Sequence, residues 1–112
     1  MHNLSYVVLR CADLERSRQF YEALGLRLSV EQHGTGSRHY SCDVGGIVLE
    51  LYPLAGKATS GARLGLVVSD LDGVVQALKS WGAEVTTGSS GSAMVVDPDG
   101  HQIALEMKRP AG

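Results

Sequence analysis

The sequence has little of what nucleic-acid-binding, membrane and secreted proteins need. Its net charge is −2, its pI is about 6.0 and aromatic residues make up 5% of it, so neither a broad basic surface nor a base-stacking platform is expected. No apolar stretch approaches the roughly 20 residues that cross a bilayer. The first ten residues, MHNLSYVVLR, lack the basic region and cleavage site of a secretory signal. We therefore expect no nucleic-acid partner, no membrane partner and a cytoplasmic location.

Cysteine is also scarce. Cys11 and Cys42 are the only two cysteines, and each lies in strand-like sequence. A disulfide framework needs more cysteines than this. The simpler interpretation is two small buried thiols in a reducing compartment.

What the sequence does contain is the composition of one globular domain. The chain has 112 residues, of which 44% are hydrophobic and 20% are charged. A chain of this length buries very roughly two thirds of the surface that its unfolded form exposes. We therefore expect a single domain over residues 1–112.

The two halves of the chain repeat one pattern. The stretch YVVLRCADLERSRQFYEALGLRL at 6–28 aligns with RLGLVVSDLDGVVQALKSWGAEV at 63–85, and DVGGIVLEL at 43–51 aligns with DPDGHQIAL at 97–105. A single internal duplication explains both alignments.

The duplication sets the expected organisation of the domain. The first module should span about 1–53 and the second about 62–112. The segment PLAGKATSG at about 53–61 has the composition of a surface linker between them.

Each half is predicted to form a strand, a helix and three further strands. Short aliphatic runs such as LSYVVLR and ARLGLVV predict strands. Asp13 and Asp70 stand where helix N-caps belong, and Gly25 and Gly82 follow as C-terminal stops. One stripe of the first helix carries Leu14, Ser17, Tyr21 and Leu24, and one stripe of the second carries Leu71, Val74, Val75 and Leu78. The predicted fold class is α+β, with two βαβββ modules that are each a curved sheet with one helix on its outer face.

Alternation along the strands separates two faces of each predicted sheet. The regularly apolar face should pack against the helix and comprises Val7, Leu9, Ile47, Leu49, Leu51, Leu64, Leu66, Val68, Ile103, Leu105 and Met107. The opposite face comprises Tyr6, Val8, Val48, Glu50, Tyr52, Arg63, Gly65, Val67, Gln102, Ala104 and Glu106. This second face is polar and mixed in size, which fits a cavity lining, although an ordinary solvent face would look similar.

Glu50 is unusual because it interrupts the apolar strand sequence GIVLELY. An ionised carboxylate in an apolar surround is costly unless a metal, a cation or hydrogen bonds compensate it. In the repeat, Tyr6 is equivalent to Arg63, and Glu50 is equivalent to Ala104. If a pseudo-twofold axis relates the modules, these four side chains can converge, and Arg63 is the expected partner of Glu50.

His39 is the histidine of greatest interest. A tight hairpin at DVGG would place it opposite Glu50. A carboxylate can orient a histidine and raise its basicity, so His39 and Glu50 are candidate catalytic residues with His39 as a general base. The alternatives are a solvent-facing or structurally hydrogen-bonded histidine, and a one-residue slip would turn it to the other face.

The other histidines have simpler interpretations, whereas two tyrosines each have two possible roles. His33 lies at the edge of the HGTGS turn and is expected at the surface, His2 lies at a frayed terminus, and His101 is expected to cap a hairpin edge. Tyr6 and Tyr52 either stack on a ligand or pack at a seam between modules or subunits.

The sequence resembles the vicinal oxygen chelate superfamily, which includes glyoxalase I, extradiol dioxygenases, fosfomycin-resistance enzymes and bleomycin-resistance proteins. The resemblance covers essentially the whole chain. It rests on VVLRCADLERSRQFYEALGLRL, VVSDLDGVVQALKSWGAEV, GIVLELY and DPDGHQIALE. It implies two βαβββ modules whose concave faces enclose a site, commonly in a homodimer.

The resemblance also implies where a metal would bind. Metal-dependent members hold a divalent cation with side chains from the first and last strands of each module, typically His and Glu. Those points fall here on Tyr6, Glu50, Arg63 and Ala104, and only Glu50 is a ligand type. Because a guanidinium can replace the charge of the metal and bind a carboxylate, no metal is expected at this position.

Three functions remain open from the sequence. The preferred function is binding of a small molecule, without a cofactor, in a metal-free cavity between the modules. The residues expected to line this cavity are Tyr6, His39, Glu50, Tyr52, Arg63 and Ala104. The second is a glyoxalase-like lyase, isomerase or dioxygenase that uses a displaced divalent metal (Zn, Ni, Mn or Fe) or a His39/Glu50 acid–base pair. The third is a structural or regulatory module in which Glu50 and Arg63 form an internal ion pair.

Overall fold

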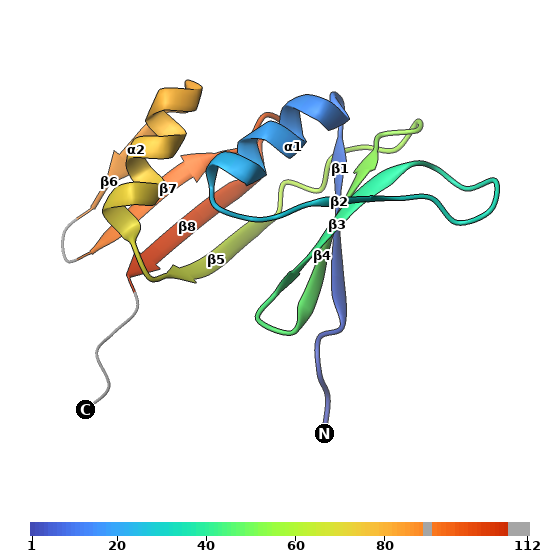
Figure 1. Ribbon diagram of the computed structural model, residues 1–112, viewed down its shortest axis with the longest axis horizontal. Coiled ribbons are helices and arrows are strands. Elements are labelled where there is room, and N and C mark those ends of the chain that lie inside the picture. The colour runs from blue at the N-terminus through green and yellow to red at the C-terminus, as the bar shows by residue number, and fades with distance from the viewer. Residues whose placement is uncertain (89–90, 108–112) are drawn as a thin grey trace.

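The computed structural model describes residues 1–88 and 91–107, so the end of the second predicted module lies outside the described residues. The elements of the first module are β1 (Tyr6–Cys11), α1 (Leu14–Ala23), β2 (Ser29–Glu31), β3 (His39–Val44) and β4 (Ile47–Pro53). Those of the second module are β5 (Arg63–Val68), α2 (Leu71–Trp81), β6 (Val85–Thr87), β7 (Ser92–Val96) and β8 (Gln102–Met107). The modules lie next to each other, and both helices lie on the same side of the molecule (Figure 1).

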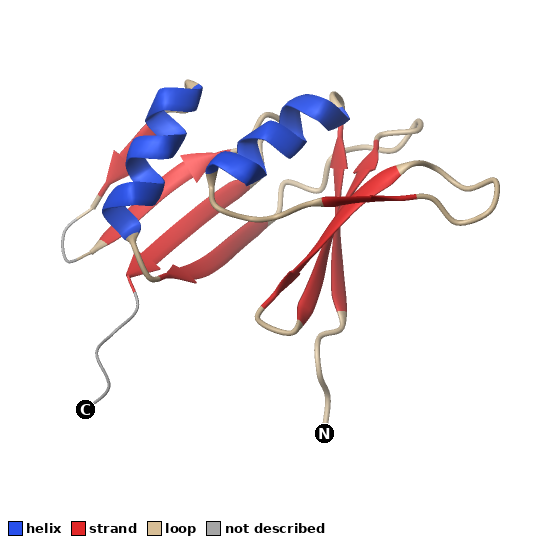
Figure 2. Ribbon diagram, viewed as in Figure 1, coloured by secondary structure: helices blue, strands red, loops and turns tan. Residues whose placement is uncertain are grey.

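Each module forms its own four-stranded sheet with the same topology. The strand orders are β1-β4-β3-β2 and β5-β8-β7-β6. The first strand of each module pairs in parallel with the last strand, and the other neighbours pair antiparallel. One helix accompanies each sheet (Figure 2). The predicted α+β fold with two βαβββ modules is therefore confirmed.

The helices begin at the predicted caps. The side chain of Asp13 accepts a hydrogen bond from the backbone N–H of Arg16 at 3.1 Å, and Asp70 accepts one from that of Gly73 at 3.0 Å. Gly82 ends α2 in the left-handed region with φ of 111°, as the sequence predicts. Neither described helix has the length and apolarity needed to cross a membrane.

The core lies between the helices and the apolar faces of the sheets. The buried strand residues include Leu9, Leu49, Leu51, Ile103 and Leu105, all from the predicted helix-facing set. The buried helix residues are Ser17, Phe20, Tyr21, Leu71, Val75 and Leu78. Two positions differ from the prediction. Phe20 is fully buried although the predicted stripe omits it, and Met107 is about half exposed because it is the last residue of β8.

The β3–β4 hairpin has a different register from the predicted one. Gly45 and Gly46 form a two-residue loop with φ of 60° and 88°, so Val44 pairs with Ile47 and Ser41 pairs with Glu50. The prediction placed His39 opposite Glu50 and is wrong by two residues. Because side chains alternate with a period of two, a shift of two residues keeps His39 on the same face as Glu50.

The carboxylates of the DPDG turn connect the second module to α1. Asp97 is buried and accepts a 2.6 Å hydrogen bond from the hydroxyl of Tyr21, and it also lies 2.8 Å from Nδ1 of His101. Asp99 accepts a hydrogen bond from the hydroxyl of Ser17 at 3.1 Å. His101 is fully buried in this network, which is a larger role than the expected hairpin cap.

Candidate functional site

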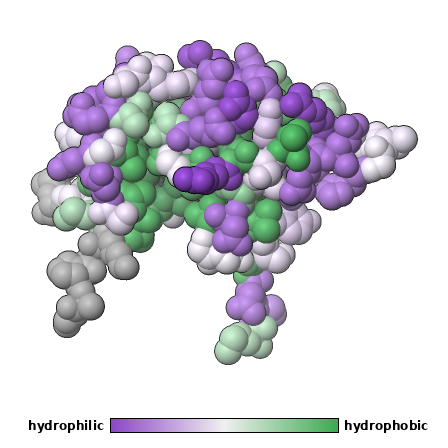
Figure 3. All heavy atoms as spheres, in the orientation of Figure 1, coloured by the Kyte–Doolittle hydropathy of each residue, from purple (hydrophilic) through white to green (hydrophobic). Residues whose placement is uncertain are grey.

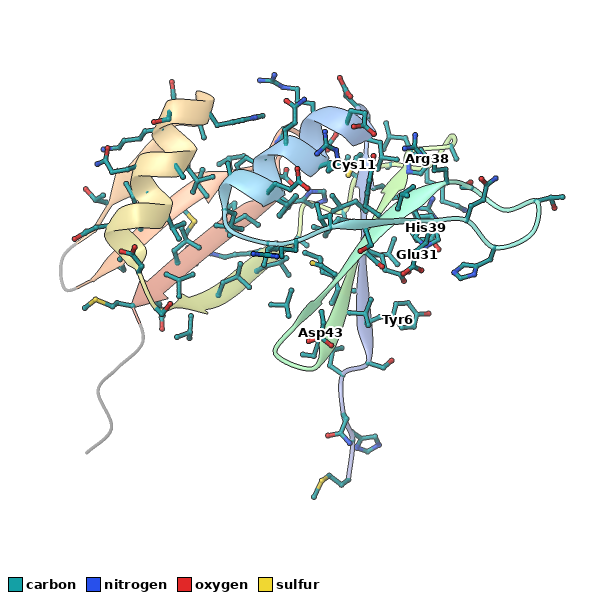
Figure 4. All side chains as sticks on the ribbon, in the orientation of Figure 1. Tyr6, Cys11, Glu31, Arg38, His39 and Asp43 are labelled. Carbon is teal, nitrogen blue, oxygen red and sulfur yellow. The ribbon has the colours of Figure 1, made fainter. Side chains whose placement is uncertain are left out.

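Four polar side chains meet on the face of the first sheet opposite α1. Pairing of β2 with β3 puts Glu31 beside His39, and pairing of β3 with β4 puts Ser41 beside Glu50. Glu31 and His39 lie close together in Figure 4, with Tyr6 farther along the face towards the N-terminus. Three strands of one module therefore build a polar cluster.

His39 is at the centre of this cluster. Its side chain is 1% exposed, and its ring stacks on Tyr52 with centroids 4.1 Å apart and planes inclined by 10°. Nδ1 lies 3.0 Å from the carbonyl oxygen of Ser37, and because a carbonyl only accepts, Nδ1 carries the proton. Nε2 is buried without a hydrogen-bond partner, 3.3 Å from Oε2 of Glu50. The other ring nitrogen, Nε2, therefore points at the carboxylates of the cluster.

Glu31 completes the cluster from the edge strand. Its Oε1 accepts a 2.5 Å hydrogen bond from the hydroxyl of Ser41, while its Oε2 lies 3.3 Å from Nε2 of His33 and 3.7 Å from Nε2 of His39. The Ser41 hydrogen bond lowers the pKa of Glu31 below its ordinary value. Glu31 is therefore a carboxylate at neutral pH.

Tyr52 and Tyr6 add aromatic surface to the same face. Burial raises the pKa of Tyr52, and the charge of Glu50 acts in the same direction, so its phenol is neutral at physiological pH. The guanidinium of Arg10 lies 5.1 Å from the centre of the Tyr52 ring. Tyr6 is 60% exposed and can contact a molecule in solution.

Arg63 and Ala104 lie apart from these residues. They line a cavity of about 270 Å³ on the second sheet, together with Thr86, Met94 and Glu106. Among the described residues Arg63 forms no ion pair with Glu50, so the expected pairing is absent within the chain. Glu50 lies beside His39 instead, with its Oε2 3.3 Å from Nε2 of the imidazole.

A larger cavity lies between the modules but excludes the predicted site residues. Its volume is about 550 Å³, and it is lined by residues 24–26, 44–45, 65–70 and Val74. Apolar side chains reach the surface below the two helices (Figure 3). This intermodular cavity is largely apolar, and the ionisable His39 and Glu50 lie on the face of the first sheet.

Sequence reasoning missed Glu31 and the contribution of His33. β2 is only three residues long, so its pairing with β3 could not be fixed from a hydrophobic pattern. The alternation of Glu31 with His33, two residues apart, was the one available signal. The structure brings both of them to His39.

Comparison with known families shows which family the chain belongs to. The family model of the Glyoxalase/Bleomycin resistance protein/Dioxygenase superfamily matches residues 3–105. The chain belongs to this superfamily. No curated protein matches the sequence.

Solved structures share the fold of this glyoxalase-superfamily chain at low identity. Fosfomycin resistance protein FosX from Mesorhizobium loti has a TM-score of 0.74 and 22% identity, covering 97% of this chain and 94% of its own. TnmS3, an antibiotic binding protein from Streptomyces sp. CB03234, has a TM-score of 0.72 and 24% identity, covering 97% and 98%. A bleomycin-binding protein complexed with bleomycin has a TM-score of 0.65 and 21% identity, covering 97% and 100%.

The four positions that the sequence resemblance assigns to a metal carry side chains poorly suited to hold one in this superfamily member. Tyr6, Glu50, Arg63 and Ala104 offer a phenol, a carboxylate, a guanidinium and a methyl group. Catalytic metal sites usually take about three protein ligands. Only Glu50 among these four side chains is a usual metal ligand, and Arg63 and Ala104 lie on the other sheet.

Proposed function

We propose that this protein binds a small organic molecule on the polar face of the first sheet, without a metal at the usual position of the superfamily. The observation that carries the proposal is His39, a buried imidazole whose Nε2 has no hydrogen-bond partner. A buried polar atom without a partner is costly in a folded protein, and a ligand that donates a hydrogen bond to it removes that cost.

The neighbouring side chains define the expected ligand chemistry. Glu50 is only 17% exposed and offers a carboxylate 3.3 Å from His39, while Tyr52 provides a neutral phenol and Tyr6 an exposed ring. This arrangement favours a molecule with a flat or apolar part and hydrogen-bond donors. Relatives named for binding antibiotics make such compounds the first class to test.

Calorimetry tests the proposal. The wild-type chain should bind a member of a panel of antibiotics and metabolites that includes bleomycin and fosfomycin. Replacing Glu50 by Gln removes a charged hydrogen-bond acceptor and should weaken binding by about 1.5–3 kcal/mol, roughly 10- to 150-fold. The control Glu84→Gln alters an exposed carboxylate of the second module and should bind as the wild type does. Binding that survives Glu50→Gln unchanged would argue against this face.

We also propose that the chain forms a homodimer that completes the site. The open faces of both sheets carry exposed apolar side chains, with Tyr6 60% and Val67 66% exposed. If the face of the first sheet meets the second sheet of a partner copy, Arg63 and Ala104 approach Glu50 from across the interface.

Light scattering on the size-separated protein tests this assembly. The wild type should have the mass of a dimer, and Val67→Glu, which places a charge on the proposed interface, should have the mass of a monomer. Thr59→Glu adds the same charge to the exposed connector and should remain dimeric. A monomeric wild type would contradict the dimer.

The contact between His39 and Glu50 also supports a second candidate function, an enzyme of the lyase, isomerase or dioxygenase kind. With Nδ1 bonded to Ser37, Nε2 is free to accept a proton from a substrate. Turnover of hemithioacetal or catechol substrates, measured with and without added Ni, Zn, Mn or Fe, would establish this function. Activity retained by His39→Gln would exclude His39 as its base.

A further inference from the structure

We propose that Glu31, His33 and His39 form a binding site for a divalent transition-metal ion, apart from the usual metal position of the superfamily. A carboxylate oxygen of Glu31 and a ring nitrogen of each histidine all lie within 4.8 Å of one another. The three residues come from β2, the β2–β3 connection and β3 of a single module. The site therefore needs neither the second module nor a partner chain.

The distances fit a small coordination sphere. Ligand atoms that lie about 2.0–2.1 Å from a tetrahedral ion are about 3.3–3.4 Å from one another. Oε2 of Glu31 lies 3.3 Å from Nε2 of His33 and 3.7 Å from Nε2 of His39. The nitrogens of His33 and His39 lie within 4.8 Å of each other, so binding one ion requires the exposed side chain of His33 to move closer to His39.

His39 supplies the independent observation that points to a ligand. The proton on Nδ1 is committed to the carbonyl of Ser37, and Nε2 is buried with no hydrogen-bond partner. Nε2 faces carboxylate oxygens of Glu50 at 3.3 Å and Glu31 at 3.7 Å. A cation bound at this nitrogen would also be attracted by both carboxylates.

Neighbouring residues already hold the donors in place. The hydroxyl of Ser41 bonds Oε1 of Glu31 and leaves Oε2 for the ion, while Ser37 and the stacked ring of Tyr52 fix the imidazole of His39. Outer contacts of this kind orient the ligands of known metal sites. Ser41 and Ser37 are thus positioning residues in this proposal.

The donor set indicates the class of metal. Two imidazoles and one carboxylate suit Zn²⁺ and similar first-row ions better than Mg²⁺ or Ca²⁺, which prefer oxygen ligands. Three protein ligands also leave a coordination position open, next to Glu50. The inference rests on the proposed function and changes one contact in it: with an ion bound to Nε2 of His39, an oxygen donor of the organic molecule would bind the ion at the open position instead of Nε2 itself.

The experiment uses the tag-free chain, stripped with chelator, with Zn²⁺ as the probe and no organic ligand. Calorimetry should give one ion per chain, and Co²⁺ should produce visible absorption bands that Zn²⁺ abolishes. His33→Gln removes a ligand that is 78% exposed, so it should fold normally and lose more affinity than any positioning variant. Ser41→Ala removes a contact that orients Glu31 and should lose roughly 10- to 100-fold or less. The matched control His2→Gln removes another exposed histidine and should bind as the wild type does.

Affinity unchanged in His33→Gln, or lost equally in His2→Gln, would overturn the site. Absence of one-to-one binding by the wild type would also overturn it. Because the Zn²⁺ titration contains no organic molecule, its result does not depend on whether the protein binds a member of the antibiotic and metabolite panel. A chain that binds the panel but not Zn²⁺ refutes only the metal site.

Discussion

The thiol of Cys11 lies on β1, fully buried. Its Sγ lies 3.7 Å from the carbonyl oxygen of Leu9. Burial raises the pKa of the thiol from 9.0 to about 12, and although a hydrogen bond with Ser17 opposes the shift, the nearby Asp99 and Asp97 favour it. The expectation that both cysteines are buried free thiols is confirmed. A buried, protonated thiol is inert towards thiol reagents near neutral pH.

Because of this raised pKa, the free energy of unfolding should fall as the pH becomes alkaline. The folded-state pKa of about 12 lies above the unfolded value of 9.0, so the contribution of Cys11 is complete below about pH 9 and is lost as the pH rises towards 12. Urea unfolding at several values between pH 8 and pH 10.5 should show a steeper fall in unfolding free energy for the wild type than for Cys11→Ala. Parallel curves would show that the thiol does not carry the effect.

Strand parity predicted the contact of His39 with Glu50, whereas no sequence pattern predicted the position of Arg63. Alternation fixes which residues share a face, and it tolerates the two-residue error in register. The relation between the modules depends on contacts such as that of Tyr21 with Asp97, which no periodic pattern encodes. The same limit explains why Glu31, on a three-residue strand, was missed.

At the scale of elements, two turns set the geometry of the molecule. The Gly45–Gly46 loop fixes the register of β3 against β4, because both glycines have positive φ. The DPDG turn holds α1 against the second module, because Asp97 accepts a buried hydrogen bond from Tyr21. Each turn lends itself to a specific stability measurement.

Replacing Gly46 by Ala tests the first turn. An alanine at φ of 88° is strained even though its Cβ meets no atom within 4 Å, so the unfolding free energy should fall by about 1 kcal/mol or more. Gly65→Ala is the matched control, since Gly65 has no positive φ and equal space. It should change stability little or raise it by about 0.4–1 kcal/mol. Equal losses in the two variants would refute the explanation from backbone conformation.

Removing the hydroxyl of Tyr21 tests the second turn. Tyr21→Phe deletes a buried donor to Asp97 and should lower the unfolding free energy by about 1–3 kcal/mol in denaturant titrations. The comparison variant Tyr6→Phe removes the hydroxyl of a tyrosine that is 60% exposed, so its effect should stay within about 0.5 kcal/mol. A neutral result for Tyr21→Phe would mean that this hydrogen bond does not stabilise the junction of α1 with the second module.

At the scale of the whole molecule, the duplication has produced two similar sheets with different chemistry. The face of the first sheet carries His39, Glu50 and Glu31, whereas the face of the second carries Arg63 beside a separate cavity. The intermodular cavity is the larger hollow but holds none of the predicted site residues. Size and chemistry therefore indicate different places for a ligand. The face of the first sheet is favoured because Nε2 of His39, which has no hydrogen-bond partner, lies there beside two carboxylates.

Backbone amide NMR during titration with a binding member of the antibiotic and metabolite panel tests that choice most directly. The account predicts that the largest chemical-shift changes fall on residues 39–41 and 50–52, with Glu50→Gln suppressing them. Changes confined to residues 24–26 and 65–68, which line the intermodular cavity, would contradict it.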